Sequence, residues 1–179
     1  ARSLAQVEWS VQLAGTTVTA TRKAIPGTAD WTHNYATPGN TYCSEDKEAK
    51  GPFGILWFGE PGPRDRVNRH ARAPMPLVID GLCLMAGYDR LMLYDAYNGR
   101  KHWEKWIPGA TRTNLPFGTS NLAVDSEHAY VVTADKSCRI LDLRSGKDLR
   151  ALVPPEESSA TPDQRYWGWL AVMDLSLIH

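Results

Sequence analysis

Residues 77–106 read LVIDGLCLMAGYDRLMLYDAYNGRKHWEKW, and this stretch decides the fold. It contains three short apolar runs, separated by Asp-Gly and by other polar residues that favour turns. A fourth segment, which is more polar, ends at Trp106. It follows the Asn98-Gly99 pair, which is a strong turn signal. Runs of this length between turn residues are typical of strands, because helices need longer periodic segments. The stretch therefore predicts four antiparallel strands joined by tight turns.

Residues 122–152 read LAVDSEHAYVVTADKSCRILDLRSGKDLRAL and repeat this order of strands and turns. Asp95 and Asp142 are 47 residues apart, and Gly99 and Gly146 have the same spacing. One four-stranded unit in every ~40–50 residues is typical of a β-propeller blade. The sequence thus predicts an all-β fold, a partial β-propeller of four-stranded antiparallel blades.

The turn before the fourth strand has the same kinds of residue in both copies of the repeat. Asp95 and Asn98 can accept hydrogen bonds from backbone N–H groups within a tight turn, and Gly99 supplies the positive φ that closes it. Asp142 and Gly146 hold the same places in the second copy. Calcium binding is the alternative role for these acidic residues. A structural turn is favoured, because the ligand density of a calcium-binding loop is missing.

Trp103 follows Gly99 by four residues, which places it on the outermost strand of the first unit. From there its large ring can cover the seam toward a neighbouring blade. The second copy has Arg150 at the corresponding place. We therefore expect a docking tryptophan in the first unit and a degenerate position in the second.

The rest of the chain is organised around these two repeats. Trp9, Val11 and Leu13 alternate with polar residues up to a turn-prone Ala-Gly-Thr, which predicts a hairpin. Residues 54–58 read GILWF and predict one more strand. The expected units are a hairpin preceding or closing the propeller at 1–27, a lead-in segment with an incomplete blade at 28–74, blades at 75–120 and 121–165, the start of a further blade at 166–174, and a terminal segment at 175–179.

Composition excludes several classes of partner. The 179 residues are 42% hydrophobic and 22% charged, which is typical of a folded globular domain. Twenty Lys and Arg balance 20 Asp and Glu, so the excess positive charge of a nucleic-acid or anionic-membrane binder is missing. No apolar run approaches the roughly 18–20 residues that cross a bilayer as a helix. We expect a protein that binds no nucleic acid and does not span a membrane.

Few of the remaining features point to a site. Cys43, Cys83 and Cys138 are far apart in the sequence, so neither a disulfide framework nor a zinc site is indicated, and buried thiols are expected. His33 is expected to be a satisfied or exposed histidine rather than a ligand. Residues 1–4 read ARSL, with no initiator Met and no signal layout, so a targeting sequence is absent or lies upstream.

The Asp-x-x-Asn/Ser-Gly-x-x-x-Trp pattern resembles the tryptophan-docking repeat of pyrroloquinoline-quinone-like propellers, the quinoprotein alcohol dehydrogenase-like family. Residues 31–41 and the run 54–57 are also similar to the segment that leads into the first regular blade of such bacterial propellers. The resemblance covers about residues 28–174. It is specific for the architecture and says little about activity, because propellers support many unrelated functions.

The resemblance implies both a fragment and a compartment. A closed propeller of this family needs several more blades than the two complete ones here, so the missing blades of the same chain are the first expected partners. The repeat is shared by quinoprotein dehydrogenases and by the propeller lipoprotein of outer-membrane barrel assembly. This implies a bacterial protein of the periplasm or cell envelope, with other envelope proteins as further partners. Residues 175–179, LSLIH, are similar to the end of a sequencing-library transposon read in one frame, and adaptor read-through is expected there, with a native strand as the alternative.

The family's dehydrogenases hold pyrroloquinoline quinone between an adjacent-cysteine disulfide and a stacking Trp, beside calcium bound by carboxylate and amide groups. This chain has no adjacent cysteines, and no Asp can be assigned as a catalytic base. We expect no catalytic, cofactor-binding or metal-binding residue in this fragment, and a noncatalytic scaffold or binding module. Two alternatives stay open. One is a fragment of a quinone-dependent alcohol or sugar dehydrogenase, in which quinone and calcium would bind, and the other is a propeller module of a larger multidomain enzyme.

Basic residues gather before the first regular blade, at Arg64, Arg66, Arg69, His70 and Arg72. Guanidinium groups match carboxylate and phosphate in a bidentate way, so Arg69, His70 and Arg72 are the candidate anion-binding residues. The alternative is a solvated loop whose charges are offset by nearby acidic residues. The solvated loop is favoured, because exposed ion pairs contribute little.

Overall fold

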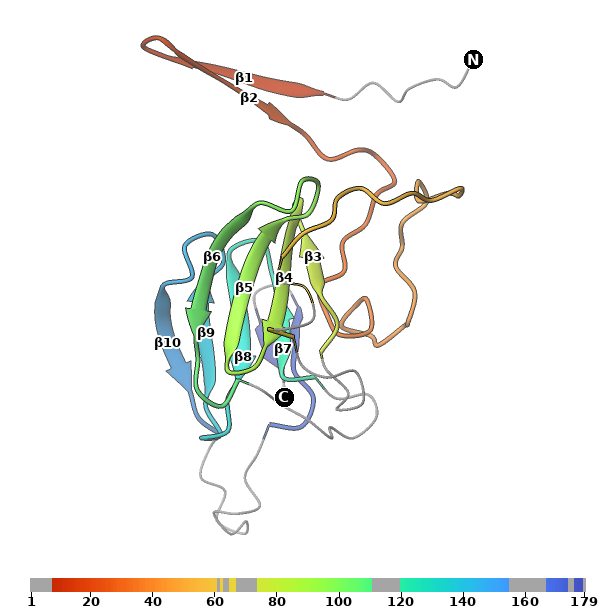
Figure 1. Cartoon of the computed structure of the whole chain (residues 1–179). Coiled ribbons are helices and arrows are strands. Elements are labelled where there is room, and N and C mark those ends of the chain that lie inside the picture. The colour runs from red at the N-terminus through yellow and green to blue at the C-terminus, as the bar shows by residue number, and fades with distance from the viewer. Residues whose placement is uncertain are drawn as a thin grey trace.

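The computed structural model describes residues 8–60, 62, 65–66, 74–110, 120–154, 167–173 and 176–178. All regular elements in these ranges are β-strands, and Figure 1 shows two four-stranded sheets standing next to each other. The predicted all-β class and the predicted four-stranded antiparallel sheets are confirmed. No helix capable of crossing a membrane occurs in this part of the chain.

Each sheet is a simple antiparallel meander in which strands adjacent in sequence are hydrogen-bonded neighbours. The first sheet, blade 1, consists of β3 (Leu77–Ile79), β4 (Leu82–Gly87), β5 (Arg90–Asp95) and β6 (Lys101–Trp106). The second, blade 2, consists of β7 (Leu122–Val124), β8 (His128–Val132), β9 (Cys138–Asp142) and β10 (Asp148–Leu152). Strand β7 contacts β3, so the two blades meet along their first strands as neighbouring blades of a propeller do.

The inner strands of a blade are covered on both faces. In β4, Leu82 and Leu84 belong to the apolar cluster shared with blade 2, whereas Cys83 and Met85 belong to a cluster on the opposite face. Because successive side chains of a strand point to opposite faces, a strand buried on both sides needs apolar residues at every position. This explains why the inner strands read as continuous apolar runs, while β6 and β10 are largely exposed.

Three apolar clusters therefore alternate with the blades. The first covers the outer face of blade 1, the second fills the space between blades 1 and 2, and the third joins blade 2 to residues 167–173. Each cluster contains or contacts a tryptophan that donates a hydrogen bond to a turn of a blade, and the cluster between the blades also contacts Trp31. In that order these are Trp57, Trp103 and Trp167.

The N-terminal hairpin stands apart from the blades at the top of Figure 1. It consists of β1 (Trp9–Ala14) and β2 (Thr17–Arg22), as the alternation of the sequence predicts. The side chains of Trp9, Val11 and Leu13 lie on one face and are 58%, 65% and 73% exposed. A two-stranded sheet with an uncovered apolar face has little stability of its own.

One turn recurs after the hairpin and after β6. Ile-Pro-Gly stands at residues 25–27 and again at 107–109. Gly27 and Gly109 both have positive φ, +87° and +76°. In both copies the carbonyl of the isoleucine accepts a hydrogen bond from the residue after the glycine, at 3.1 and 3.0 Å. By this shared turn, β1–β2 corresponds to β5–β6, the outer half of a blade.

Two sequence predictions are wrong. The run 54–58 forms no strand, because no neighbouring segment pairs with its backbone in the described chain. Its Ile55 and Phe58 side chains are 87% and 97% exposed. Cys83 and Cys138 are buried as expected, but Cys43 is exposed, because it lies in an irregular stretch outside the apolar clusters.

The segment after blade 2 begins a further pair of strands. Strand β11 (Ala171–Met173) pairs antiparallel with β12 (Ser176–Ile178) and contacts β7. The strand alternative for the terminal residues is thus what the structure contains. The adaptor origin of residues 175–179 stays a prediction, because the pairing of a segment does not reveal its origin.

A pair of leucine substitutions separates the blades from the hairpin. Leu93 is 1% exposed in β5, whereas Leu13 is 73% exposed in β1. We expect Leu93→Ala to lower the free energy of unfolding by about 2–5 kcal/mol, because it opens a cavity between the blades. Leu13→Ala should change it by less than about 0.5 kcal/mol. Urea denaturation of both variants is the measurement, and equal losses would contradict the assignment of the core.

Candidate functional site

The seams between blades hold the most regular polar geometry in the molecule. In blade 1 the turn between β5 and β6 is closed by Asp95, whose Oδ1 accepts hydrogen bonds from the backbone N–H groups of Tyr97 and Asn98 at 2.8 and 3.1 Å. The N–H of Gly99 donates to the carbonyl of Asp95 at 2.9 Å, and Gly99 has a φ of +72°. Asn98 Oδ1 in turn accepts from the Arg100 N–H at 2.9 Å.

Trp57 docks on this turn. Its indole Nε1–H donates to the carbonyl oxygen of Ala96 at 2.9 Å. The ring lies so close to Gly99 that a Cβ there would be 2.4 Å from Trp57 Cε3. Gly99 is therefore required twice, for its backbone conformation and for the approach of the indole.

The turn between β9 and β10 has the same form. Asp142 Oδ1 accepts hydrogen bonds from the Ser145 hydroxyl and backbone N–H at 2.5 and 2.7 Å. These bonds lower the pKa of the Asp142 carboxyl. The N–H of Gly146 donates to the Asp142 carbonyl at 2.8 Å, and Gly146 has a φ of +69°.

Trp103 docks on this second turn in the same manner. It lies on β6, and its Nε1–H donates to the carbonyl oxygen of Leu143 at 2.9 Å. A Cβ on Gly146 would lie 2.8 Å from Trp103 Cδ2. Ala96 and Leu143 are each the residue after the turn aspartate, so the two docking contacts are equivalent. One indole hydrogen bond and one glycine contact thus occur at each of these two turns.

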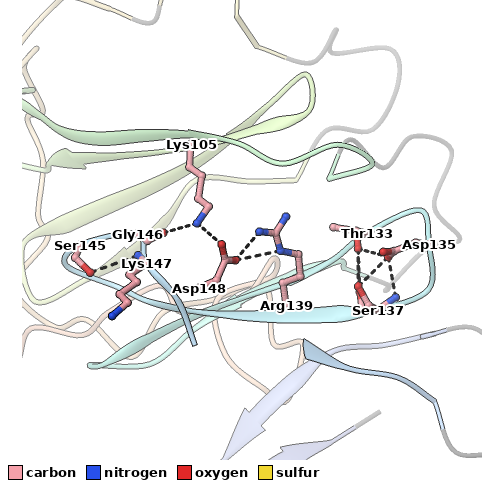
Figure 2. Close-up of polar contacts among 9 residues, drawn as sticks. All are labelled: Lys105, Thr133, Asp135, Ser137, Arg139, Ser145, Gly146, Lys147 and Asp148. Atoms are coloured by element: carbon pink, nitrogen blue, oxygen red, sulfur yellow. Dashed lines mark hydrogen bonds and ion pairs between the residues drawn. The ribbon is translucent and has the colours of Figure 1, made fainter. Parts of the chain in front are cut away.

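An ion-pair network reinforces the seam between blades 1 and 2. Figure 2 shows Lys105 of β6 reaching across to blade 2, where its Nζ donates to the Gly146 carbonyl at 3.0 Å and to the Asp148 carboxylate. Arg139 donates to the other oxygen of Asp148 through Nε and Nη2, at 3.1 and 2.5 Å. Burial raises the pKa of Asp148, but the bonds from Lys105 and Arg139 outweigh it and the pKa is lowered.

The seam beyond blade 2 uses different groups. In the β8–β9 turn, Asp135 Oδ1 accepts hydrogen bonds from the hydroxyls of Thr133 and Ser137 at 2.5 and 2.8 Å, as Figure 2 shows. Trp167 donates from Nε1 to the carbonyl of Lys136 in this turn, at 3.1 Å. Arg150, at the position equivalent to Trp103, is exposed. Trp167 thus contacts a different turn of blade 2 from the one that Trp103 contacts.

The two buried cysteines and the Asp125 carboxylate are held in structural surroundings. Burial raises the pKa of the Cys83 thiol and raises that of Cys138 to about 12, so both stay protonated near neutral pH. The Asp125 carboxylate accepts a hydrogen bond from the Tyr130 hydroxyl at 2.7 Å and is close to His128. Backbone N–H groups of the same turn also donate to Asp125. This cluster therefore closes a turn, as Asp95 does in blade 1.

An open groove of about 440 Å³ lies at the base of the hairpin. It is lined by cationic and anionic side chains together, Arg22, Arg144, Asp30 and Asp80 among them. Asp30 Oδ1 accepts a hydrogen bond from the Asp80 N–H at 3.3 Å, and burial raises the pKa of Asp30. Charges of both signs give the groove no preference for one kind of ion.

The candidate anion-binding residues Arg69, His70 and Arg72 lie outside the described residues, as does Arg64. Arg66 is described, and it is exposed and bridges to Gly87 of β4. In the described ranges, no group of three His, Cys, Asp or Glu side chains is placed to hold a metal ion.

No family model and no curated protein matches the chain. Among solved structures it is similar to the quinohemoprotein alcohol dehydrogenase ADHIIG from Pseudomonas putida HK5. That match has a TM-score of 0.50 and 18% identity, and it covers 73% of this chain and 20% of the dehydrogenase chain. A match to BamB from Moraxella catarrhalis has a TM-score of 0.36 and 16% identity, and it covers 55% of this chain and 31% of that chain.

The two sheets therefore have the fold of β-propeller blades, similar to blades of the quinohemoprotein alcohol dehydrogenase. The likeness to the dehydrogenase supports this architecture, whereas the likeness to BamB is too weak to add to it. The match spans 20% of the length of the dehydrogenase chain. At 18% identity the similarity concerns the fold and carries no activity over.

Sequence reasoning missed two parts of the seams. Trp57 was assigned to a strand, although it lies 46 residues before Trp103, close to the repeat length, and this spacing could have identified it as a docking residue. The bridge from Lys105 to Asp148 had no signal in the sequence. Its partners lie on different blades, and only the packing of the blades brings them together.

Substitution at Gly99 tests the docking contact. Gly99→Ala should lower the free energy of unfolding by about 1–3 kcal/mol, because it strains the positive φ and displaces the Trp57 indole. Gly54→Ala is the matched control, since a Cβ there has no atom within 4 Å, and it should have no effect. Thermal denaturation compares the two. Equal melting temperatures for the Gly99 variant and the parent chain would refute the contact.

Proposed function

We propose that this chain belongs to a noncatalytic β-propeller scaffold, a binding or assembly module of the bacterial cell envelope. The observation that carries the proposal is the docking contact that recurs at successive seams, from Trp57 to blade 1 and from Trp103 to blade 2. A scaffold needs blades held at a fixed relation to one another. A repeated indole-to-turn contact provides this, because it fixes blade 1 to the lead-in segment and blade 2 to blade 1.

The distribution of polar groups supports the same proposal. Asp95, Asp142 and Asp135 each accept hydrogen bonds within their own turn, and Asp148 joins the blades through Lys105. These carboxylates stabilise the architecture, and none of them is left to act as an acid or a base. Their role is to close turns and fasten seams.

The compartment and the partners are part of the proposal. The motif resemblance favours the periplasm or cell envelope, and envelope proteins are the proposed partners. The missing blades of the same chain are proposed as the first of them. The supporting observation is the uncovered apolar face of the hairpin, which corresponds to the outer half of a blade.

A second candidate function is that of a part of a quinone-dependent dehydrogenase. The fold likeness to a quinohemoprotein alcohol dehydrogenase favours it. The described residues do not fit pyrroloquinoline quinone with calcium. The three cysteines are free and apart, and within the described ranges no acidic cluster is placed for a hard cation. Under this alternative the cofactor would depend on blades outside the present chain.

Titration with pyrroloquinoline quinone and calcium distinguishes the two functions. We expect no saturable quenching of tryptophan fluorescence at micromolar quinone, because two blades supply only a minority of the groups that converge on a propeller axis. The control is the same titration without calcium, which measures nonspecific quenching. Saturable quenching that requires both quinone and calcium would favour the dehydrogenase and overturn the scaffold.

A further inference from the structure

His33 lies where three parts of the chain meet. Its own segment forms an isolated antiparallel bridge with Ala123 of β7, and the Val124 N–H donates to the Thr32 carbonyl at 3.1 Å. On its other side, His33 contacts β11 through Val172. The imidazole is 3% exposed, so the lead-in segment, blade 2 and the third unit (residues 167–173) enclose it.

Both ring nitrogens of His33 are engaged. Nε2 accepts a hydrogen bond from the Val172 backbone N–H at 3.0 Å, and Nδ1 lies 2.8 Å from the Thr32 hydroxyl oxygen. A backbone N–H can only donate, so Nε2 must be unprotonated and the ring proton must be on Nδ1. Thr32 Oγ1 then accepts a hydrogen bond from the Nδ1–H group. The geometry thus requires a neutral imidazole in one tautomer.

A second proton is incompatible with this arrangement. It would have to sit on Nε2, facing the Val172 N–H, and it would put a charge in a site that is closed to water. Burial lowers the pKa of His33 to about 4, in agreement with the geometry. Protonation therefore requires that Val172 move away from the ring.

The charged groups nearby do not offset this cost. The contacting strands, Leu122–Val124 and Ala171–Met173, carry no titratable side chain. Asp125, at the end of β7, is engaged by Tyr130 and by its own turn. On the lead-in segment, Asp30 accepts a hydrogen bond from Asp80, and Tyr35 stacks on Tyr42.

The described residues of the third unit also contact blade 2 through a hydrogen bond and through apolar packing. Trp167 donates to the Lys136 carbonyl, and Leu170 and Val172 pack in the third apolar cluster. Strand β11 has only three residues, and it pairs with β12 rather than with a strand of blade 2. The bond to His33 therefore adds a titratable contact to the hydrogen bond of Trp167 and the apolar packing.

We propose that His33 is a pH-sensitive latch, which holds the third unit against blade 2 while its imidazole is neutral and releases that unit when the ring gains a proton. The proposal rests on local geometry and is independent of whether the protein is a scaffold or part of an enzyme. Its consequence is a seam that loosens in acid, while blade 1 and its contact with blade 2 persist.

The size of the effect follows from linkage. The pKa of His33 is about 4 when the seam is closed, against 6.5 for a free histidine, which is taken for the open state. Because the closed-state pKa is depressed, the latch is at full strength above pH ~6.5 and is lost as the pH falls toward 4. Between pH 7 and pH 5 the opening equilibrium should rise about 20-fold.

Hydrogen exchange of the Val172 amide is the direct measurement, made on the full chain at pH 7 and pH 5 and corrected for the intrinsic exchange rate. We expect its protection to fall about 20-fold between these pH values. Amides of β5 in blade 1 should keep their protection. The imidazole resonances of His33 should titrate well below pH 6.5, near pH 4.

His33→Gln is the deciding variant, because a glutamine oxygen can accept the Val172 N–H but does not titrate. We expect it to keep protection at pH 7 and to lose the pH dependence. His128→Gln and Asp30→Asn are matched controls for the other titratable groups nearby, and both should keep the pH dependence. Thr32→Val should weaken protection at pH 7 while leaving the pH dependence, and it serves if His33→Gln does not fold.

Two results would overturn the latch. One is a Val172 protection that falls with acid as much in His33→Gln as in the parent chain. The other is a parallel loss of protection in β5, which would mean that acid unfolds the whole chain. In the Thr32→Val chain, a Val172 protection independent of pH would count against the latch in the same way.

Discussion

The contact between an indole ring and a glycine turn is the constraint on which the seams depend. The Trp57 ring can reach the Ala96 carbonyl only because Gly99 has no side chain. The turn also needs the positive φ that glycine adopts there. One residue type thus satisfies two requirements at once. Trp103 and Gly146 repeat this contact at the next seam, so the same indole-to-turn contact is made on both blades.

This constraint explains the character of the strands. If each blade is covered on both faces by its neighbours, its inner strands must be apolar at every position, as Leu82–Gly87 is. The outermost strand contributes an indole and one ion pair to the seam and exposes most of its other residues, as Lys101–Trp106 does. The number of covered faces of a strand is therefore reflected in how continuous its apolar run is.

Much of the fold could be predicted from the sequence, because a repeat of 47 residues preserves turns and strands together. The docking role of Trp103 could be inferred for the same reason. The docking role of Trp57 could also be inferred from its spacing of 46 residues from Trp103, close to the repeat length, although its segment forms no strand. The bond from His33 to Val172 spans 139 residues, and no local pattern encodes a contact of that separation. The anion-binding hypothesis at Arg69, His70 and Arg72 stays a prediction.

The seam beyond blade 2 differs from the other two in a way that bears on the latch. Arg150 stands where a docking tryptophan would be, so the outer strand of blade 2 brings no indole to the next unit. The next unit instead contacts the β8–β9 turn, where Trp167 donates to the Lys136 carbonyl, and the lead-in segment, where His33 accepts from the Val172 N–H. An indole bond is indifferent to pH, whereas an imidazole bond is not. Because the outer strand of blade 2 brings no indole to this seam, the stability of the seam depends in part on His33, a group that titrates.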